Sequence, residues 1–311
     1  MEEQSGKWTG IMLAIIAATL WGVSGTLVQF LFEKRGINIA WLVTARLLIS
    51  GTILLVFSGV RKDPGLWKIW TNRKDSIQLI LFSILGMLAV QYTYFAAIKH
   101  SNAATGTILQ YIGPVLITIY FVIKNRKWPA PAEYMAIFLA VSGTFLLVTH
   151  GSIQQLSISR WALFWGLASA VSLAYYNIQP MSLLKKYSSS VIIGWAMLVG
   201  GTAISFVKPI WQVEGIWDTY TFAYTAFIIL LGSLVAFYIY MIAIGIIGAQ
   251  TTSLLASAEP LSSTLLAVIW LQVPFGKMDW LGTLFILTTI FLLTKKKKPV
   301  ITEAVILAEN S

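Results

Sequence analysis

The chain has 311 residues, of which 57% are hydrophobic and 11% are charged, and its net charge is +10. A soluble globular domain carries about 25% charged residues, so this composition excludes a water-facing surface over most of the molecule and predicts an integral membrane protein. The basic residues occur in short runs between apolar stretches, which indicates membrane topology rather than a nucleic-acid-binding face. Cysteine is absent, which excludes disulfides, thiol catalysis and thiolate metal sites.

Ten stretches are apolar enough to form transmembrane helices, each of which needs about 20 residues. The sequence therefore predicts an all-α integral membrane protein with ten transmembrane helices. Polar and basic runs such as Arg61–Gly65 separate the stretches, and the segment 295–311 is a basic and then polar tail without a core-forming pattern. In chain order the predicted helices cover 9–32, 40–60, 76–98, 102–123, 132–149, 161–181, 189–208, 221–245, 249–272 and 279–294.

The distribution of Lys and Arg predicts the orientation. If the N-terminus is inside, 15 of the 22 basic residues fall in inside segments and 6 in outside segments, while Arg46 lies within a helix. Basic residues concentrate on the cytoplasmic side, so we expect both termini to be cytoplasmic. An even number of helices agrees with this, because it places the cluster Lys295–Lys298 inside. Short loops favour a plasma membrane protein.

An internal duplication is the most informative pattern. The segment Gly86–Pro114 aligns without gaps on Gly232–Pro260, and 10 of 29 positions are identical, including two tyrosine pairs and the proline. The predicted units are a first five-helix repeat at 8–149 and a second at 161–294. Because five is odd, the second copy enters the membrane from the opposite side, so the repeats are inverted. Many secondary transporters have this architecture, with the substrate site where the repeats meet near the midplane.

Two formal charges lie inside predicted helices, and each costs about 2.5–3.5 kcal/mol on insertion scales unless it is paired or faces water. Arg46 lies in the second helix, and Glu259 lies near the middle of the ninth. Glu259 is a candidate for proton coupling or for binding a charged part of the substrate. Arg46 is a candidate substrate partner or a structural residue, and a pair between the two is an alternative.

Polar residues recur at helical spacing around two prolines, Pro114 and Pro260, which we expect to break the fourth and ninth helices because proline frees a backbone carbonyl. Polar stripes turn away from lipid, so they either line a wet cavity or bond neighbouring helices. The candidate cavity residues are Trp21, Gln91, Tyr94, Gln110, Tyr111, Tyr176, Gln179, Tyr238, Tyr240 and Ser257.

Over about 10–294 the chain resembles the EamA branch of the drug/metabolite transporter superfamily. The resemblance rests on Leu20-Trp21-Gly22, Ala45-Arg46-Leu47, the Ala-rich segment that leads to Pro114, and Ala258-Glu259-Pro260. It implies a transporter with a central cavity between two repeats. The family often has a Leu-Gly-Glu turn after the fourth and ninth helices, but here Lys127 and Val273 stand at the matching positions, so any role of that glutamate is absent or replaced.

The favoured function is a secondary-active transporter, an exporter of small metabolites such as amino acids or amines, that works by alternating access. No nucleotide-binding loop of the Gly-x-x-x-x-Gly-Lys-Ser type occurs, and we expect no metal or other cofactor, no nucleic acid partner, and a small-molecule substrate with protons as a possible coupling ion. One alternative is a non-transporting scaffold or receptor. Another is an intramembrane hydrolase using Ser24 in Gly22–Gly25, for which only His100 and His150 could serve as base.

Overall fold

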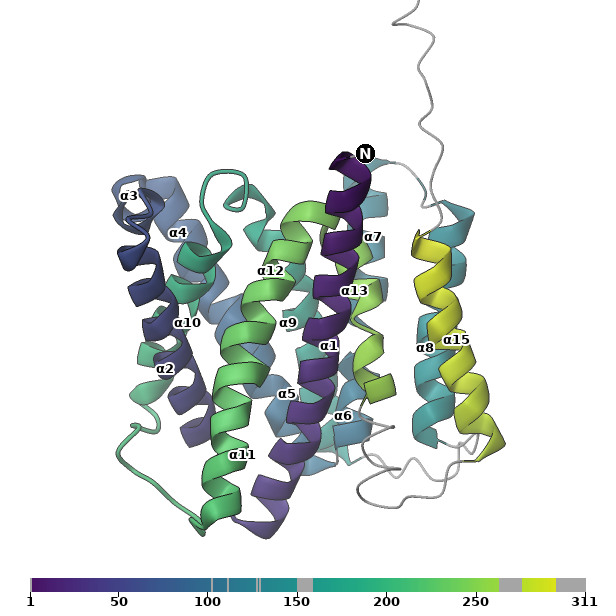
Figure 1. The fold of residues 1–311 in the computed structure, drawn as a ribbon. Helices are drawn as coiled ribbons and strands as arrows, with labels where there is room; N and C mark the ends of the chain where they lie inside the picture. The colour runs from purple at the N-terminus through teal and green to yellow at the C-terminus, as the bar shows by residue number, and fades with distance from the viewer. Residues whose placement is uncertain are drawn as a thin grey trace, which may run out of the picture.

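The computed structural model describes residues 2–101, 103–110, 112–126, 128, 130–149, 159–262 and 276–294, and the regular elements in these ranges are all helical. Figure 1 shows them as a bundle of long helices that run side by side. In chain order the elements are α1 (Glu2–Lys34), α2 (Ile39–Val60), α3 (Gly65–Thr71), α4 (Arg73–Leu81), η1 (Phe82–Leu88), α5 (Ala89–His100), α6 (Ala103–Gln110), α7 (Gly113–Asn125), α8 (Pro131–Thr149), α9 (Arg160–Ile178), η3 (Gln179–Ser182), α10 (Ser189–Ser205), α11 (Thr219–Ile229), η4 (Leu230–Val235), α12 (Ala236–Ile247), α13 (Ala249–Leu255) and α15 (Lys277–Thr294).

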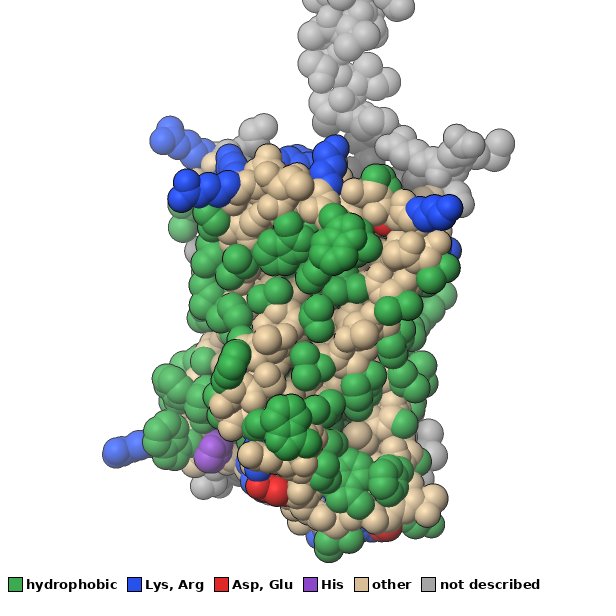
Figure 2. Space-filling model, turned by 90° about the vertical axis from the view of Figure 1, so that its left-hand side faces the viewer, with side chains coloured by type: hydrophobic (Ala, Val, Ile, Leu, Met, Phe, Trp, Pro, Cys, Tyr) green, Lys and Arg blue, Asp and Glu red, His purple; other side chains and the backbone are tan. Residues whose placement is uncertain are grey.

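Four helical segments of the described chain are long and apolar enough to cross a membrane: Gly6–Lys34, Ile39–Val60, Arg73–His100 and Thr219–Ile247. Many large apolar side chains point outward, and they cover much of the face in Figure 2. A soluble protein does not expose apolar surface on this scale, so the chain is an all-α multi-pass membrane protein. The number of ten helices stays a prediction, because residues 263–275, which include the end of the predicted ninth helix, lie outside the described part.

The helices differ from the predicted ones most clearly in three respects. Helix α1 begins at Glu2, before the apolar stretch starts. Helix α9 ends at Ile178, and Pro180 lies in the 3-10 turn η3, because proline cannot donate the backbone bond that would continue the α-helix. The short helix α3 was not predicted, since its seven residues are too few to show a period.

Both helices that carry a proline at matching positions are interrupted beside it. Helix α6 ends at Gln110, and α7 restarts at Gly113 with Pro114 in its first turn. Helix α13 ends at Leu255, and the Glu259 N–H donates to Ala256 O only three residues back, just before Pro260. Proline is tolerated in a first helical turn because its missing N–H would have no partner there.

Two π-helical turns, η1 and η4, lie inside otherwise continuous helices. In η1 the Ser83 hydroxyl donates to Leu79 O, and in η4 the Ser233 hydroxyl donates to Ile228 O, five residues back. The Ala236 N–H in turn donates to Leu231 O. Such wide turns redirect carbonyls and side chains and are frequent at functional sites.

The helices pack in four main pairs: α2 against α10, α8 against α15, α5 against α9, and α1 against α12. Figure 1 shows α8 and α15 together on one side of the bundle and α2 and α10 on the other. The α2–α10 contact is close because glycines face it: a Cβ on Gly51 would lie 2.7 Å from Leu198 N, and a Cβ on Gly201 would lie 2.9 Å from Leu48 N. Small residues let helix backbones approach in this way in membranes.

Candidate functional site

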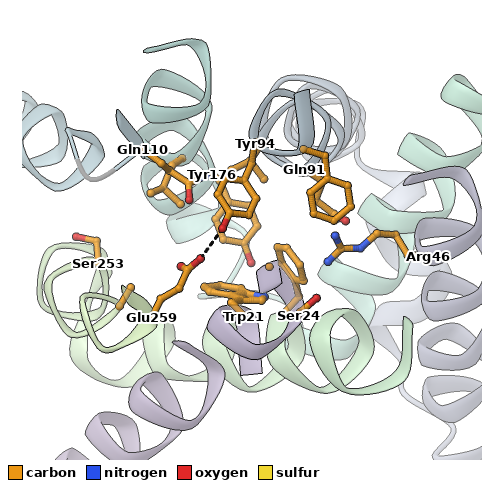
Figure 3. A pocket seen from close by; sticks show the side chains of 15 residues that line it. Trp21, Ser24, Arg46, Gln91, Tyr94, Gln110, Tyr176, Ser253 and Glu259 are labelled. Carbon is orange, nitrogen blue, oxygen red and sulfur yellow. Dashed lines mark hydrogen bonds between the residues drawn. The ribbon is translucent and has the colours of Figure 1, made fainter. Parts of the chain in front are cut away.

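A cavity of about 50 Å³ lies inside the bundle, enclosed mainly by α1, α2, α5, α9, α12 and the segment after α13 (Figure 3). Most of its wall is apolar or aromatic, with polar groups at separate points, as in small-molecule sites generally. The wall residues are Trp21, Ser24, Gly25, Arg46, Val90, Gln91, Tyr94, Phe95, Gln110, Leu173, Tyr176, Phe237, Ser253, Ala256 and Glu259.

Glu259 contributes a carboxylate to one side of the cavity (Figure 3). Its side chain is 5% exposed, and its Oε1 accepts a hydrogen bond of 3.1 Å from the Tyr94 hydroxyl. The Tyr94 oxygen also lies 3.0 Å from the Thr107 hydroxyl. Among the described residues Glu259 has no ion-pair partner. Glu259 follows closely on the interruption of the helix at Ala256 and Ser257, beside Pro260.

Arg46 contributes the opposite charge, at the other side of the cavity (Figure 3). Its Nε donates 2.7 Å to the Ser233 hydroxyl, and its Nη2 donates 3.2 Å to Gly232 O, both in the π turn η4. The guanidinium lies over the Phe95 ring at 4.6 Å and near the Phe237 ring at 5.8 Å. The described part of the chain offers it no acidic partner. Arg46 and Glu259 therefore do not form an ion pair in this structure.

Three polar atoms on the cavity wall are buried without a hydrogen-bond partner among the described residues: Trp21 Nε1, Gln91 Oε1 and Tyr176 Oη. The Gln91 amide donates only to Met87 Sδ, at 3.1 Å. An unpaired buried polar atom costs about 1–3 kcal/mol. We therefore expect polar groups of a molecule bound in the cavity to form hydrogen bonds with these three atoms.

An aromatic layer supports the wall. The Trp21 ring lies 4.7 Å from that of Tyr240 and 4.9 Å from that of Phe237, and the Tyr176 ring stacks on Phe82 at 5.5 Å. Tyr240 is fully buried behind this wall. These contacts fix the rings, so the shape of the cavity is defined by packed side chains from α1, α9 and α12.

The structure brings together seven of the residues that the sequence singled out: Arg46, Glu259, Trp21, Gln91, Tyr94, Gln110 and Tyr176. It places four candidates elsewhere. Tyr240 donates to Asn177 Oδ1 behind the wall, Gln179 donates to Gln78 O, Tyr238 packs on Phe57, and Ser257 donates to Leu254 O.

Tyr111 and the family-variant positions Lys127 and Val273 lie outside the described residues. Among the wall residues, Ser24, Gly25, Phe95 and Phe237 were not predicted to line the cavity. An aromatic residue in an apolar helix carries no sequence signal that distinguishes a cavity wall from ordinary packing, which is why Phe95 and Phe237 were missed.

Of the two histidines that a hydrolase could use, the described one, His100, does not reach Ser24. His100 is exposed at the end of α5, where its ring stacks on that of Trp161 at 6.3 Å, and His150 lies outside the described residues. Ser24 instead lines the cavity next to Gly232, whose added Cβ would lie 2.6 Å from the Ser24 hydroxyl oxygen. The described site therefore offers Ser24 close packing and no histidine base.

Comparisons with known proteins agree with this architecture. The profile of the EamA-like transporter family matches residues 8–149 and again 160–295. The chain is 38% identical to the uncharacterized inner membrane transporter YicL of Salmonella typhimurium, over 92% of this chain and 95% of that protein, and 22% identical to the uncharacterized transporter YwfM of Bacillus subtilis, over 87% and 88%. A solved crystal structure shares the fold with a TM-score of 0.71 over 98% of both chains at 17% identity. The resemblance inferred from the sequence is thus confirmed, and the chain belongs to the EamA-like transporter family.

Proposed function

We propose that this protein is a secondary-active transporter that binds a small amphipathic metabolite in the central cavity. The observation that carries the proposal is the pair of charges in the wall: Arg46 and Glu259 are both buried and both without an ion-pair partner among the described residues. A buried charge left without a counter-charge is costly inside a membrane. In a transporter, a charged group of the substrate or a proton can supply the missing partner, so unpaired charges in the wall favour binding of either one.

The chemistry of the wall favours a ligand with polar groups around an apolar body. The guanidinium of Arg46 fits an anionic group, and the carboxylate of Glu259 fits an ammonium group or a proton. The unpaired Trp21 Nε1 can donate, and the unpaired Gln91 Oε1 can accept. Amino acids and amines are therefore the classes that we propose to test first, with export as the direction.

The packing of the helices supports two inverted repeats and alternating access. If the predicted repeats exchange places, α1 corresponds to α9 and α5 corresponds to α12. The contact of α1 with α12 then maps onto that of α9 with α5, while α2–α10 and α8–α15 map onto themselves. The π turns η1 and η4 and the two breaks beside Pro114 and Pro260 recur in the same way. In this proposal one repeat rocks against the other around the cavity, and both termini face the cytoplasm.

Glu259 is the proposed proton-coupling residue. Its carboxylate is buried on the cavity wall and is held by the Tyr94 hydroxyl, a partner that can either donate to it or accept from it. A proton can therefore be taken up or released there without moving the backbone. Substrate and proton then compete for Glu259, and this competition couples substrate transport to proton transport.

The experiment is a screen for ligand-induced thermal stabilisation of the purified protein with amino acids, amines and small carboxylates. A ligand that binds the folded state raises its apparent stability by mass action. We expect at least one of these classes to stabilise the wild type and to be taken up by proteoliposomes. Binding without any uptake would favour a receptor, and neither binding nor uptake across the three classes would contradict the proposed substrate.

A further inference from the structure

A second pocket, of about 400 Å³, lies at one end of the bundle and is separate from the cavity. It lies between α3, the start of α4 and the segment that leads into α10. Its lining residues all carry a polar or charged group: Lys68, Thr71, Asn72, Asp75, Lys186 and Tyr187. We propose that this pocket binds the phosphate of an anionic phospholipid of the surrounding bilayer.

The position of the lining residues in the chain indicates how deep the pocket lies in the membrane. The apolar span Ile39–Val60 ends just before α3, and the next span, Arg73–His100, begins just after it. The pocket therefore lies where two spans end, which is the level of the lipid headgroups. Figure 2 shows most of the visible Lys and Arg side chains at this end of the molecule, where anionic headgroups attract basic side chains.

The lining holds an uncompensated positive charge. Asp75 is buried, and its carboxylate already accepts from Lys186 Nζ at 2.8 Å and from the Tyr187 hydroxyl at 2.8 Å. Lys68 has no acidic partner in the part of the chain that the structure describes. The lining thus carries one more positive than negative charge, which matches the single negative charge of a phosphodiester.

Hydrogen-bond donors converge on the same pocket. Asn72 caps α4 by accepting from the backbone N–H groups of Lys74 and Asp75 with its Oδ1, which fixes the amide and leaves its Nδ2 donor for a ligand. The Lys186 side chain is held in place by Asp75 and still remains 53% exposed. A phosphate in the pocket would therefore meet the Lys68 and Lys186 ammonium groups and the Asn72 amide.

Apolar surface beside the pocket favours a lipid over free phosphate. Trp67, the neighbour of Lys68, is 67% exposed, and its ring contacts that of Trp195 at 5.4 Å. Helix α4 continues into the span with Ile77, Ile80 and Leu81 exposed. A headgroup in the pocket would leave its acyl chains against such apolar side chains, whereas a free anion would gain nothing from them.

The test compares lipids by thermal unfolding of the detergent-purified full chain during titration with phosphatidylglycerol or phosphatidylcholine. We expect phosphatidylglycerol to raise the unfolding temperature and phosphatidylcholine to have little effect. Lys68→Gln should weaken the apparent dissociation constant for phosphatidylglycerol about fivefold, which corresponds to the loss of one basic contact near the surface. Lys68→Arg, which keeps the charge, should bind as the wild type does.

The matched control is Lys185→Gln, which removes an exposed neighbouring charge that does not line the pocket. Lys186→Gln is avoided because it would leave Asp75 buried without its cation. If Lys185→Gln weakened binding as much as Lys68→Gln, or if Lys68→Gln bound as tightly as the wild type, the pocket would not be the site. Equal stabilisation by inorganic phosphate alone would assign the pocket to a free anion and overturn the lipid proposal.

Discussion

The hydroxyl of Tyr94 on α5 donates a hydrogen bond of 3.1 Å to Oε1 of Glu259, which lies 165 positions later in the chain. The bond joins a helix of the first predicted repeat to the interrupted segment of the second, and it lies on the wall of the cavity. A side chain that touches both repeats at the cavity is well placed to respond to what the cavity binds.

Replacing Tyr94 by phenylalanine should lower stability modestly and change ligand binding strongly. The stability loss should be about 1 kcal/mol, because interhelical hydrogen bonds in membranes contribute about that much or less. Thermal unfolding measures the first effect, and the screen for stabilising ligands measures the second. Gly25→Ala should disturb the same hydrogen bond from another side, since its added Cβ would lie 3.0 Å from the Tyr94 hydroxyl oxygen. Unchanged ligand binding in both variants would show that the contact is only structural.

Replacing Ser233 by alanine should disturb Arg46. The Ser233 hydroxyl accepts from Arg46 Nε at 2.7 Å inside the π turn η4, so the variant leaves one buried guanidinium donor unpaired. We expect a loss of about 1–2 kcal/mol in stability and weaker binding of anionic ligands in particular. Ser262→Ala is the control, because that hydroxyl donates to Glu259 O and accepts from no arginine in the described chain. Equal effects of both variants on anion binding would argue against a role for Arg46.

Replacing Gly51 by alanine should destabilise the α2–α10 contact. The added Cβ would lie 2.7 Å from Leu198 N, which is backbone and cannot move aside without shifting the helix. Overpacking of this kind costs about 1–3 kcal/mol. Gly245→Ala is the matched control, since nothing lies within 4 Å of its added Cβ and alanine is the better helix former. Thermal unfolding in one detergent compares the two, and a tolerated Gly51→Ala would contradict the described pairing.

The loop before α11 should make stability depend on pH. Hydrogen bonds from the Thr221 backbone N–H and hydroxyl, and then the Arg35 guanidinium at 2.8 Å, hold the pKa of Asp218 below its ordinary value of 3.8. Ionised Asp218 therefore stabilises the folded state above pH 3.8, and this contribution disappears as the pH falls through the lowered pKa.

The corresponding variant is Asp218→Asn. Its unfolding temperature should be below that of the wild type at pH 7, and the gap should close as the pH drops below about 4. Glu33→Gln is the control, because Glu33 is exposed and accepts only from Gln29 of its own helix among the described residues. A gap that stayed constant with pH would mean that the charge of Asp218 contributes nothing.

The charged residues of the cavity could be located from the sequence because charge is rare in membrane helices. Arg46 and Glu259 interrupt long apolar runs, and a buried charge in such a run faces the protein interior or water, not lipid. Both indeed lie on the cavity wall. Polar stripes predicted Gln91, Tyr94 and Gln110 by the same argument.

The structure was needed to show which other candidates do not line the cavity and which wall residues the sequence had not indicated. Tyr238 and Tyr240 are two positions apart, and residues at that spacing do not share a face of a helix, so only one of them could turn toward the core. Gln179 does not line the cavity, because the α-helix ends before it and η3 begins there, beside Pro180. Phe95 and Phe237 look like ordinary packing residues in the sequence, and only their position over Arg46 gives them a role at the site.

The most direct test of the account is to measure uptake of the best-stabilising ligand by proteoliposomes over a range of pH, for the wild type and for Glu259→Gln. A transporter that couples to protons at Glu259 should show pH-dependent uptake in the wild type, and the variant should lose that dependence together with most of the ligand-induced stabilisation. Gly245→Ala, with its substitution in open space, should behave as the wild type. If Glu259→Gln kept both the stabilisation and the same pH dependence, the central role given to Glu259 would be contradicted.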